Sequence, residues 1–174
     1  IKLLRENGIH SIKSKFKNLP YYPNYYEQVD SGFNFRMSEI SAALVNSQLK
    51  KLNFFVNKRN QIAKTYLKLI KNPKFIFQEN SIDAKSSYHL FVVKLTSQNR
   101  NQYLKIFKIF NKNKIFINLH YKALHLNPFF EEMGFKKGQF PISENYSYTA
   151  FSIPIFVGLA EKNIKKIISI LNNF

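Results

Sequence analysis

A helical pattern that runs from Ser38 to Ile70 does most to limit how this chain can fold. Ser38 suits the N-cap position of a helix, and Glu39 suits its positive end. Because the run is long for one globular helix, we predict two helices end to end, with a break near Asn53 and an end before Pro73. The apolar residues recur at three- and four-residue steps, which is the period of a helix with one buried face: Ile40, Ala43, Leu44, Leu52, Phe55, Val56, Ile62, Ala63, Tyr66, Leu69 and Ile70.

Short strand and helix patterns alternate after Pro73. The strand patterns are rich in β-branched and aromatic residues and fall at Phe75–Phe77, His89–Leu95, Ile115–Leu119 and Phe151–Ile153. The helical patterns fall at Arg100–Asn111, at Ser143–Thr149 and around Ile164, Ile167, Ile168 and Leu171. This order predicts the α/β fold class, with a small α/β domain at the end of a long helical connector.

The N-terminal residues show a different organisation. Residues 1–8 read as the end of a helix that stops at Gly8, a residue that readily takes the left-handed conformation. Residues 9–33 lack a helical period and predict a long loop, which in compact domains is usually functional or interfacial. The loop contains two prolines and a tyrosine cluster, and filling of a surface groove is an equally good reading of it: Pro20, Pro23, Tyr21, Tyr22, Tyr25 and Tyr26.

The formal net charge of +17 raises the question of a nucleic-acid partner. A nucleic-acid binder is expected to cluster its positive charge, whereas the lysines here are spread over almost every segment. We therefore expect neither a nucleic-acid nor a membrane partner. The absence of cysteine excludes disulfides and thiolate metal sites, and it fits a cytoplasmic protein. His120 and His125 lack a nearby carboxylate pair that would complete a metal site, although Glu131 and Glu132 follow, so no metal is predicted.

Four motifs occur in a fixed order along the chain. The central one is Gly32-Phe-Asn-Phe-Arg-Met-Ser-Glu-Ile-Ser-Ala-Ala-Leu, which runs on to Gln48-Leu-Lys-Lys-Leu. The others are Lys2-Leu-Leu-Arg-Glu-Asn-Gly-Ile, Asn118-Leu-His-Tyr-Lys-Ala-Leu-His-Leu-Asn-Pro-Phe-Phe, and the pair Gly134-Phe-Lys-Lys-Gly-Gln-Phe-Pro-Ile-Ser-Glu and Phe151-Ser-Ile-Pro. Together they resemble the DegT/DnrJ/EryC1/StrS family of sugar aminotransferases over essentially the whole chain. Within the family, the Gly134–Pro141 run and Tyr25-Tyr26-Glu27 are most similar to the UDP-4-amino-4,6-dideoxy-N-acetyl-β-L-altrosamine transaminases of pseudaminic acid biosynthesis. The perosamine-type and other 4-amino sugar synthases are the alternatives within the family.

The resemblance implies the C-terminal part of a pyridoxal-phosphate-dependent transferase with the aspartate aminotransferase fold, fold type I. Residues 1–37 would be the tail end of the large cofactor domain and an interface loop, 38–72 the connecting helices, and 73–174 the small α/β domain. In the family the cofactor-binding lysine lies upstream of the segment that here starts at residue 1. We therefore expect no catalytic residue in this chain and no activity from the chain alone.

The resemblance also implies the reaction. With pyridoxal 5′-phosphate as cofactor, an amino group would move from glutamate to the C4 keto group of a UDP-linked 4-keto-6-deoxy sugar for nonulosonate or surface glycan synthesis. The expected partners are a second identical subunit or an intact homologous one, with the UDP-sugar and glutamate as substrates. The alternative is a non-catalytic basic module that pairs with an intact subunit or an anionic partner.

Five residues take site roles from the resemblance. Asn34 matches the asparagine that reaches across the dimer to the cofactor phosphate, and Arg36 matches the arginine beside it that would approach the substrate diphosphate. His120, Tyr121 and His125 match the segment near the sugar-nucleotide site. Judged by its residue type alone, Asn34 is better interpreted as the cap of a turn, and Arg36 could form a surface ion pair. The other three could equally be packed or surface side chains.

Overall fold

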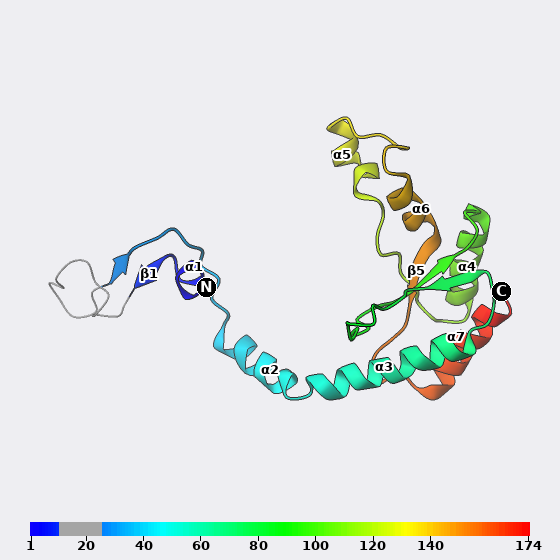
Figure 1. The fold of residues 1–174 in the computed structure, drawn as a ribbon, viewed down its shortest axis with the longest axis horizontal. Coiled ribbons are helices and arrows are strands. Elements are labelled where there is room, and N and C mark those ends of the chain that lie inside the picture. Colours follow the sequence, from blue (N-terminus) through cyan, green and yellow to red (C-terminus); the bar gives the residue numbers. More distant parts are fainter. Residues whose placement is uncertain (11–25) are drawn as a thin grey trace. The chain divides into compact units, whose positions relative to one another are not determined.

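The computed structural model of the chain describes residues 1–10 and 26–174 (Figure 1). Tyr21, Tyr22 and Tyr25 of the predicted loop lie outside the described residues, as do both of its prolines. The contacts divide the chain into two compact units, Ile1–Lys51 and Leu52–Phe174. Among the described residues, no helix has both the length and the apolar character needed to cross a bilayer.

The first unit begins with the short helix α1, Lys2–Arg5, whose C-cap is Glu6. The predicted left-handed conformation of Gly8 is confirmed by its φ of +71°. Strands β1, Ile9–His10, and β2, Glu27–Gln28, pair antiparallel within the segment predicted as a loop. These two-residue strands are too short to leave an alternating pattern in the sequence.

Two glycines of the first unit, Gly8 and Gly32, lie where backbone segments approach each other closely. A Cβ atom on Gly8 would sit 1.7 Å from the carbonyl oxygen of Asp30, and one on Gly32 would sit 2.5 Å from the backbone nitrogen of Gly8. The same backbone segments are joined by hydrogen bonds from Gly8 N to Leu3 O, 2.7 Å, and from Val29 N to Gly8 O, 2.8 Å. This close approach brings the chain after Gly32 against α1.

The long helical pattern forms two helices, as predicted. Helix α2 spans Glu39–Leu49 and α3 spans Leu52–Leu69, so the break falls at residues 50–51, just before Asn53. Ser38 is the N-cap of α2, and its Oγ accepts a hydrogen bond from Ser41 N at 3.2 Å. The two helices differ in burial: α2 has no buried residue, whereas α3 buries Ile62, Ala63 and Tyr66.

A three-stranded antiparallel sheet organises the second unit. Its order is β3, Phe75–Phe77, then β4, Phe91–Leu95, then β5, Ala150–Ile153. The predicted strand at Ile115–Leu119 is wrong, because only Asn118 of that segment forms a bridge, to Ser152. The amide of Ile115 instead donates to Phe110 O at the end of the preceding helix, and Phe116 is 77% exposed.

Helices cover this sheet. They are α4, Arg100–Lys112, α6, Pro141–Thr149, and α7, Glu161–Asn172. The 3-10 turn η2, Leu124–Leu126, and the short helix α5, Pro128–Glu132, follow α4 in the chain, and α5 buries no residue. Helix α3 lies beside α7 (Figure 1). The four largest fully buried side chains come from the helices and strands alike and belong to one core: Tyr66, Phe91, Phe110 and Phe151.

Candidate functional site

Asn34 lies in the irregular segment between β2 and α2, called the Asn34 turn below, and the backbone ties this segment to α1. It forms an isolated antiparallel bridge with Glu6. On either side, Phe33 N donates to Leu4 O at 2.6 Å and Phe35 N donates to Arg5 O at 3.1 Å. The turn therefore has a defined backbone although its side chains are exposed.

The side chains of Asn34 and Arg36 meet directly. Arg36 Nε donates to Asn34 Oδ1 at 3.0 Å. Because this bond uses the amide oxygen, the two N–H groups of Asn34 Nδ2 remain as donors. Arg5, hydrogen-bonded to Glu6, holds the pKa of Glu6 below its ordinary value, and the charge of Arg36 lowers that pKa further. The turn thus presents an amide and a guanidinium side by side, which are donors suited to phosphate oxygens.

His120 is held by a serine of the sheet. Its Nδ1 lies 2.9 Å from Ser152 Oγ. The ring of Tyr121 stands edge-on to that of His120 with 4.9 Å between centroids, and Tyr121 is 72% exposed. These two predicted site residues are therefore adjacent, and both reach the surface of the second unit.

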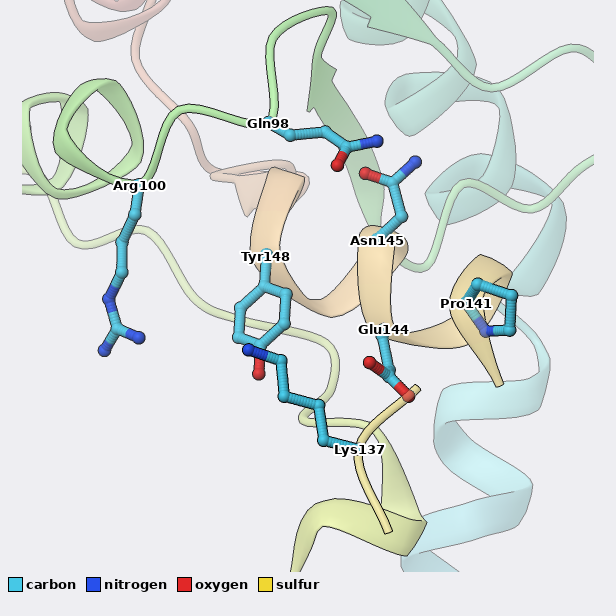
Figure 2. A pocket seen from close by; sticks show the side chains of 7 residues that line it. All are labelled: Gln98, Arg100, Lys137, Pro141, Glu144, Asn145 and Tyr148. Atoms are coloured by element: carbon cyan, nitrogen blue, oxygen red, sulfur yellow. The ribbon is translucent and has the colours of Figure 1, made fainter. Parts of the chain in front are cut away.

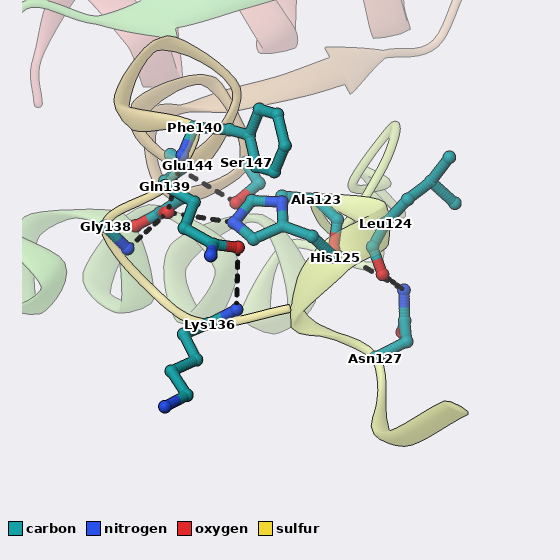
Figure 3. A network of polar contacts seen from close by, with 10 residues as sticks. All are labelled: Ala123, Leu124, His125, Asn127, Lys136, Gly138, Gln139, Phe140, Glu144 and Ser147. Atoms are coloured by element: carbon teal, nitrogen blue, oxygen red, sulfur yellow. Dashed lines mark hydrogen bonds and ion pairs between the residues drawn. The ribbon is translucent and has the colours of Figure 1, made fainter. Parts of the chain in front are cut away.

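His125 is buried, with its side chain in a network of polar contacts (Figure 3), and it also lines a small pocket together with Leu124 and Phe140. Its Nε2 donates to Glu144 Oε1 at 2.8 Å, and the same oxygen accepts from Gly138 N at 2.6 Å and from Phe140 N at 3.4 Å. The hydrogen bond from His125, with those from the two backbone amides, lowers the pKa of Glu144. His125 therefore connects η2 to the loop before α6. A packed side chain was one of the two readings of His125 from its residue type.

A polar pocket that sequence reasoning missed lies beside this network (Figure 2). It has a volume of about 410 Å³ and is lined by Gln98, Arg100, Lys137, Pro141, Glu144, Asn145 and Tyr148. The Nζ of Lys137 lies 6.0 Å from the centre of the Tyr148 ring. Asn145 Oδ1 is buried and has no hydrogen-bond partner in the part of the chain that the structure describes. No sequence signal singled out Arg100 or Lys137 among the 27 Lys and Arg residues.

Ser152 and Glu144 are the residues whose contacts were not foreseen. Both stand in motifs that carry the family resemblance, Phe151-Ser-Ile-Pro and Phe140-Pro-Ile-Ser-Glu, and this is the signal that could have found them. Among residues 1–10 and 26–174, no three His, Asp or Glu side chains come together in a way that could hold a metal ion.

Comparison with known proteins identifies the family. The DegT/DnrJ/EryC1/StrS aminotransferase family matches residues 1–172. The UDP-4-amino-4,6-dideoxy-N-acetyl-beta-L-altrosamine transaminase of Helicobacter pylori is 30% identical over 82% of this chain and 38% of its own length. The protein of that name from Campylobacter jejuni serotype O:2 is 31% identical over 95% of this chain and 42% of its own length.

Solved structures agree with these relatives. Helicobacter pylori PseC, an aminotransferase involved in the biosynthesis of pseudoaminic acid, matches with a TM-score of 0.80 and 26% identity over 99% of this chain and 44% of that one. The PMP-form of the putative sugar aminotransferase Spr1654 from Streptococcus pneumoniae matches in fold, with a TM-score of 0.83 at 20% identity over 99% of this chain and 43% of that one. The chain thus spans less than half the length of these relatives. The fold predicted from the motifs, the C-terminal part of a pyridoxal-phosphate-dependent transferase, is confirmed, and the chain belongs to the DegT/DnrJ/EryC1/StrS aminotransferase family.

Proposed function

We propose that this chain is part of a cytoplasmic, homodimeric aminotransferase that moves an amino group from glutamate to the C4 keto group of a UDP-linked 4-keto-6-deoxy sugar. The product would enter nonulosonate or surface glycan synthesis. The family match over residues 1–172 carries the proposal. The names of the Helicobacter and Campylobacter relatives, at 30% and 31% identity, support the choice of sugar.

The Asn34 turn fits the phosphate of pyridoxal 5′-phosphate. Asn34 Nδ2 keeps two donors because Arg36 occupies Oδ1, and Arg36 adds a positive charge within the same turn. The charge of Arg36 acts on the nearby Glu6, and no hydrogen bond or salt bridge within residues 1–10 and 26–174 uses its terminal nitrogens, so we assign this guanidinium to the substrate diphosphate. Pyridoxal phosphate, when bound, supplies the electron sink for removing a proton from the amino donor.

The second unit contributes sugar-nucleotide contacts under this proposal. His120 and Tyr121 are the residues that reach the surface, and we assign them to the substrate. His125 acts indirectly, by holding the loop before α6 through Glu144. In the same scheme residues 1–37 belong to the cofactor domain, 38–72 connect the domains, and 73–174 form the small domain.

An amino-transfer assay distinguishes activity of the chain alone from activity that requires a second subunit. With pyridoxal phosphate, glutamate and the UDP-4-keto sugar, we expect no turnover from residues 1–174 alone, because they match only 38% and 42% of the length of the two transaminases. We expect turnover when the chain is assembled with a Campylobacter jejuni subunit whose own turn asparagine has been replaced. Asn34→Ala should abolish that recovery, and Asn173→Ala, an exposed amide at the end of α7, should not.

The outcomes of this assay distinguish part of an aminotransferase from a non-catalytic partner. Robust turnover by the chain alone would contradict the view that it is silent by itself. Association without recovery would favour the second candidate, a non-catalytic partner of an intact subunit. That candidate has its own support in the net charge of +17 and in the exposed apolar side chains of α2 and the turn before it: Phe33, Phe35, Met37, Ile40, Leu44 and Leu49.

A further inference from the structure

Ser152 is a buried polar residue in the middle of a strand, and its position is fixed by backbone on both sides. It pairs with Val92 of β4 in the sheet register. On its other side, Ser152 N donates to Asn118 O at 2.8 Å, and Asn118 N donates to Ser152 O at 3.2 Å. The side chain is only 6% exposed. Its hydroxyl therefore has few choices of partner.

The hydroxyl has one proton and two acceptors near it. His120 Nδ1 lies 2.9 Å from Oγ, and Asn118 O lies 3.5 Å from it. Hydroxyl hydrogen bonds cluster at about 2.5–3.0 Å, so the distance to Asn118 O is long and the distance to Nδ1 is favourable. The two distances favour a Ser152 proton that points to Nδ1, with Nδ1 as the acceptor.

This fixes the other nitrogen of the ring. A neutral imidazole with an accepting Nδ1 carries its proton on Nε2, which makes Nε2 a donor. His120 is half-buried, and no group of the described chain pairs with its Nε2. His125 contrasts with it, because the Nε2 of His125 is occupied by Glu144.

We propose that Ser152 is a positioning residue that holds neutral His120 in the tautomer with the proton on Nε2, so that His120 donates a hydrogen bond to an oxygen of the nucleotide sugar. The tautomer follows from the contacts of the chain alone. The identity of the ligand rests on the proposed function. The two parts are tested by different measurements, so one can fail without the other.

The tautomer is measured on the whole chain by nitrogen NMR. Histidine is labelled with nitrogen-15, spectra are recorded at about pH 8.5 to keep imidazoles neutral, and His120→Gln assigns the signal among the four histidines. We expect an acceptor-type shift at Nδ1 and a protonated-type shift at Nε2. The opposite assignment, with the proton on Nδ1, would overturn the proposal.

Three variants show whether Ser152 is the cause. Ser152→Ala should move the Nδ1 signal of His120 towards the value of a ring that samples both tautomers. Ser152→Thr keeps the hydroxyl and should restore the shift. Ser147→Ala removes another buried hydroxyl, which donates to Glu144 O at 2.9 Å, and should leave His120 unchanged. Unchanged signals from His125 in the two Ser152 variants show that the fold is intact, and an unmoved Nδ1 signal in Ser152→Ala would refute the role of the serine.

The ligand is tested in the assembly with the Campylobacter subunit. Loss of one hydrogen bond from His120→Phe should raise KM for the keto sugar about five- to tenfold. Ser152→Ala should raise KM by a smaller factor, and kcat should change little in either variant. If the tautomer is as stated but KM does not change, the substrate role of His120 is wrong while the assignment of the proton stands.

Discussion

Replacing Tyr66 with phenylalanine removes a single oxygen atom from a fully buried ring of α3. The ring is 0% exposed and meets Phe91 edge-on with 5.1 Å between centroids, and both features survive the change. What is lost is the hydrogen bond that Tyr66 Oη donates to Pro154 O, 2.9 Å long, which ties α3 to the residues that follow β5. The perturbation therefore isolates one contact without opening a large cavity.

The cost follows from where the two partners lie. A neutral hydrogen bond contributes about 1 kcal/mol net, and a buried acceptor left without a donor costs up to about 3 kcal/mol. Pro154 is only half-buried, so water partly replaces the lost donor. We expect Tyr66→Phe to lower the free energy of unfolding by about 1–2 kcal/mol, or to lower Tm by roughly 2–8 °C for a chain of this size.

Urea unfolding followed by circular dichroism measures this change. The midpoint should fall while the slope of the transition stays the same, which is the mark of altered stability rather than altered compactness. Tyr121→Phe is the matched control, because Tyr121 is 72% exposed and its loss of a hydroxyl should stay within about 0.5 kcal/mol. Equal midpoints for the two variants would refute the reasoning.

Three further predictions concern the second unit. The pKa of Glu144 is lowered by His125 and by two backbone amides, so its carboxylate stabilises the fold above its ordinary pKa of 4.5 and this stabilisation is lost as the pH falls; acid titration of Glu144→Gln should show a smaller loss of stability below about pH 4.5. Burial raises the pKa of Tyr103 to about 12 from an ordinary 10.0, so the stability gained from its neutral form is complete below pH 10.0 and declines towards about pH 12; alkaline unfolding of Tyr103→Phe should be less steep, and an unchanged profile would show that this ring does not contribute. Asn145 Oδ1 makes no hydrogen bond within the described residues, so Asn145→Ala should raise the free energy of unfolding by about 0.5 kcal/mol through helix propensity; a loss above about 1 kcal/mol in thermal melts would indicate a partner for that oxygen.

The helices and the main strands were accessible from the sequence because their signals are local. Strand β3 occurs at the predicted residues Phe75–Phe77, and the break between α2 and α3 falls within a few residues of Asn53. The segment Ile115–Leu119 has the same apolar character as a strand, yet it forms only one bridge. Its pairing depends on how α4 ends, which the composition of the segment does not encode.

The candidate site was accessible only in part. The motif order pointed to Asn34 and Arg36, and the two are hydrogen-bonded to each other. The contacts that define His120 and His125 join them to residues 32 and 19 positions away, and such pairs leave no periodic signal in one sequence. The family resemblance therefore identified the candidate residues. The structure identified their partners, and these distinguish the half-buried His120 from the buried His125.

The close backbone contacts at Gly8 and Gly32 have a consequence for large-scale mutagenesis. The atoms that a new Cβ would meet belong to the backbone, namely Asp30 O for Gly8 and the nitrogen of Gly8 for Gly32. The penalty is therefore set by the first carbon of any side chain and not by its bulk. In a saturation library selected for folded protein, alanine should be depleted at these two codons about as strongly as tryptophan, giving a flat substitution profile. Gly134, where an added Cβ would meet nothing within 4 Å, should instead show a graded profile governed by its positive φ.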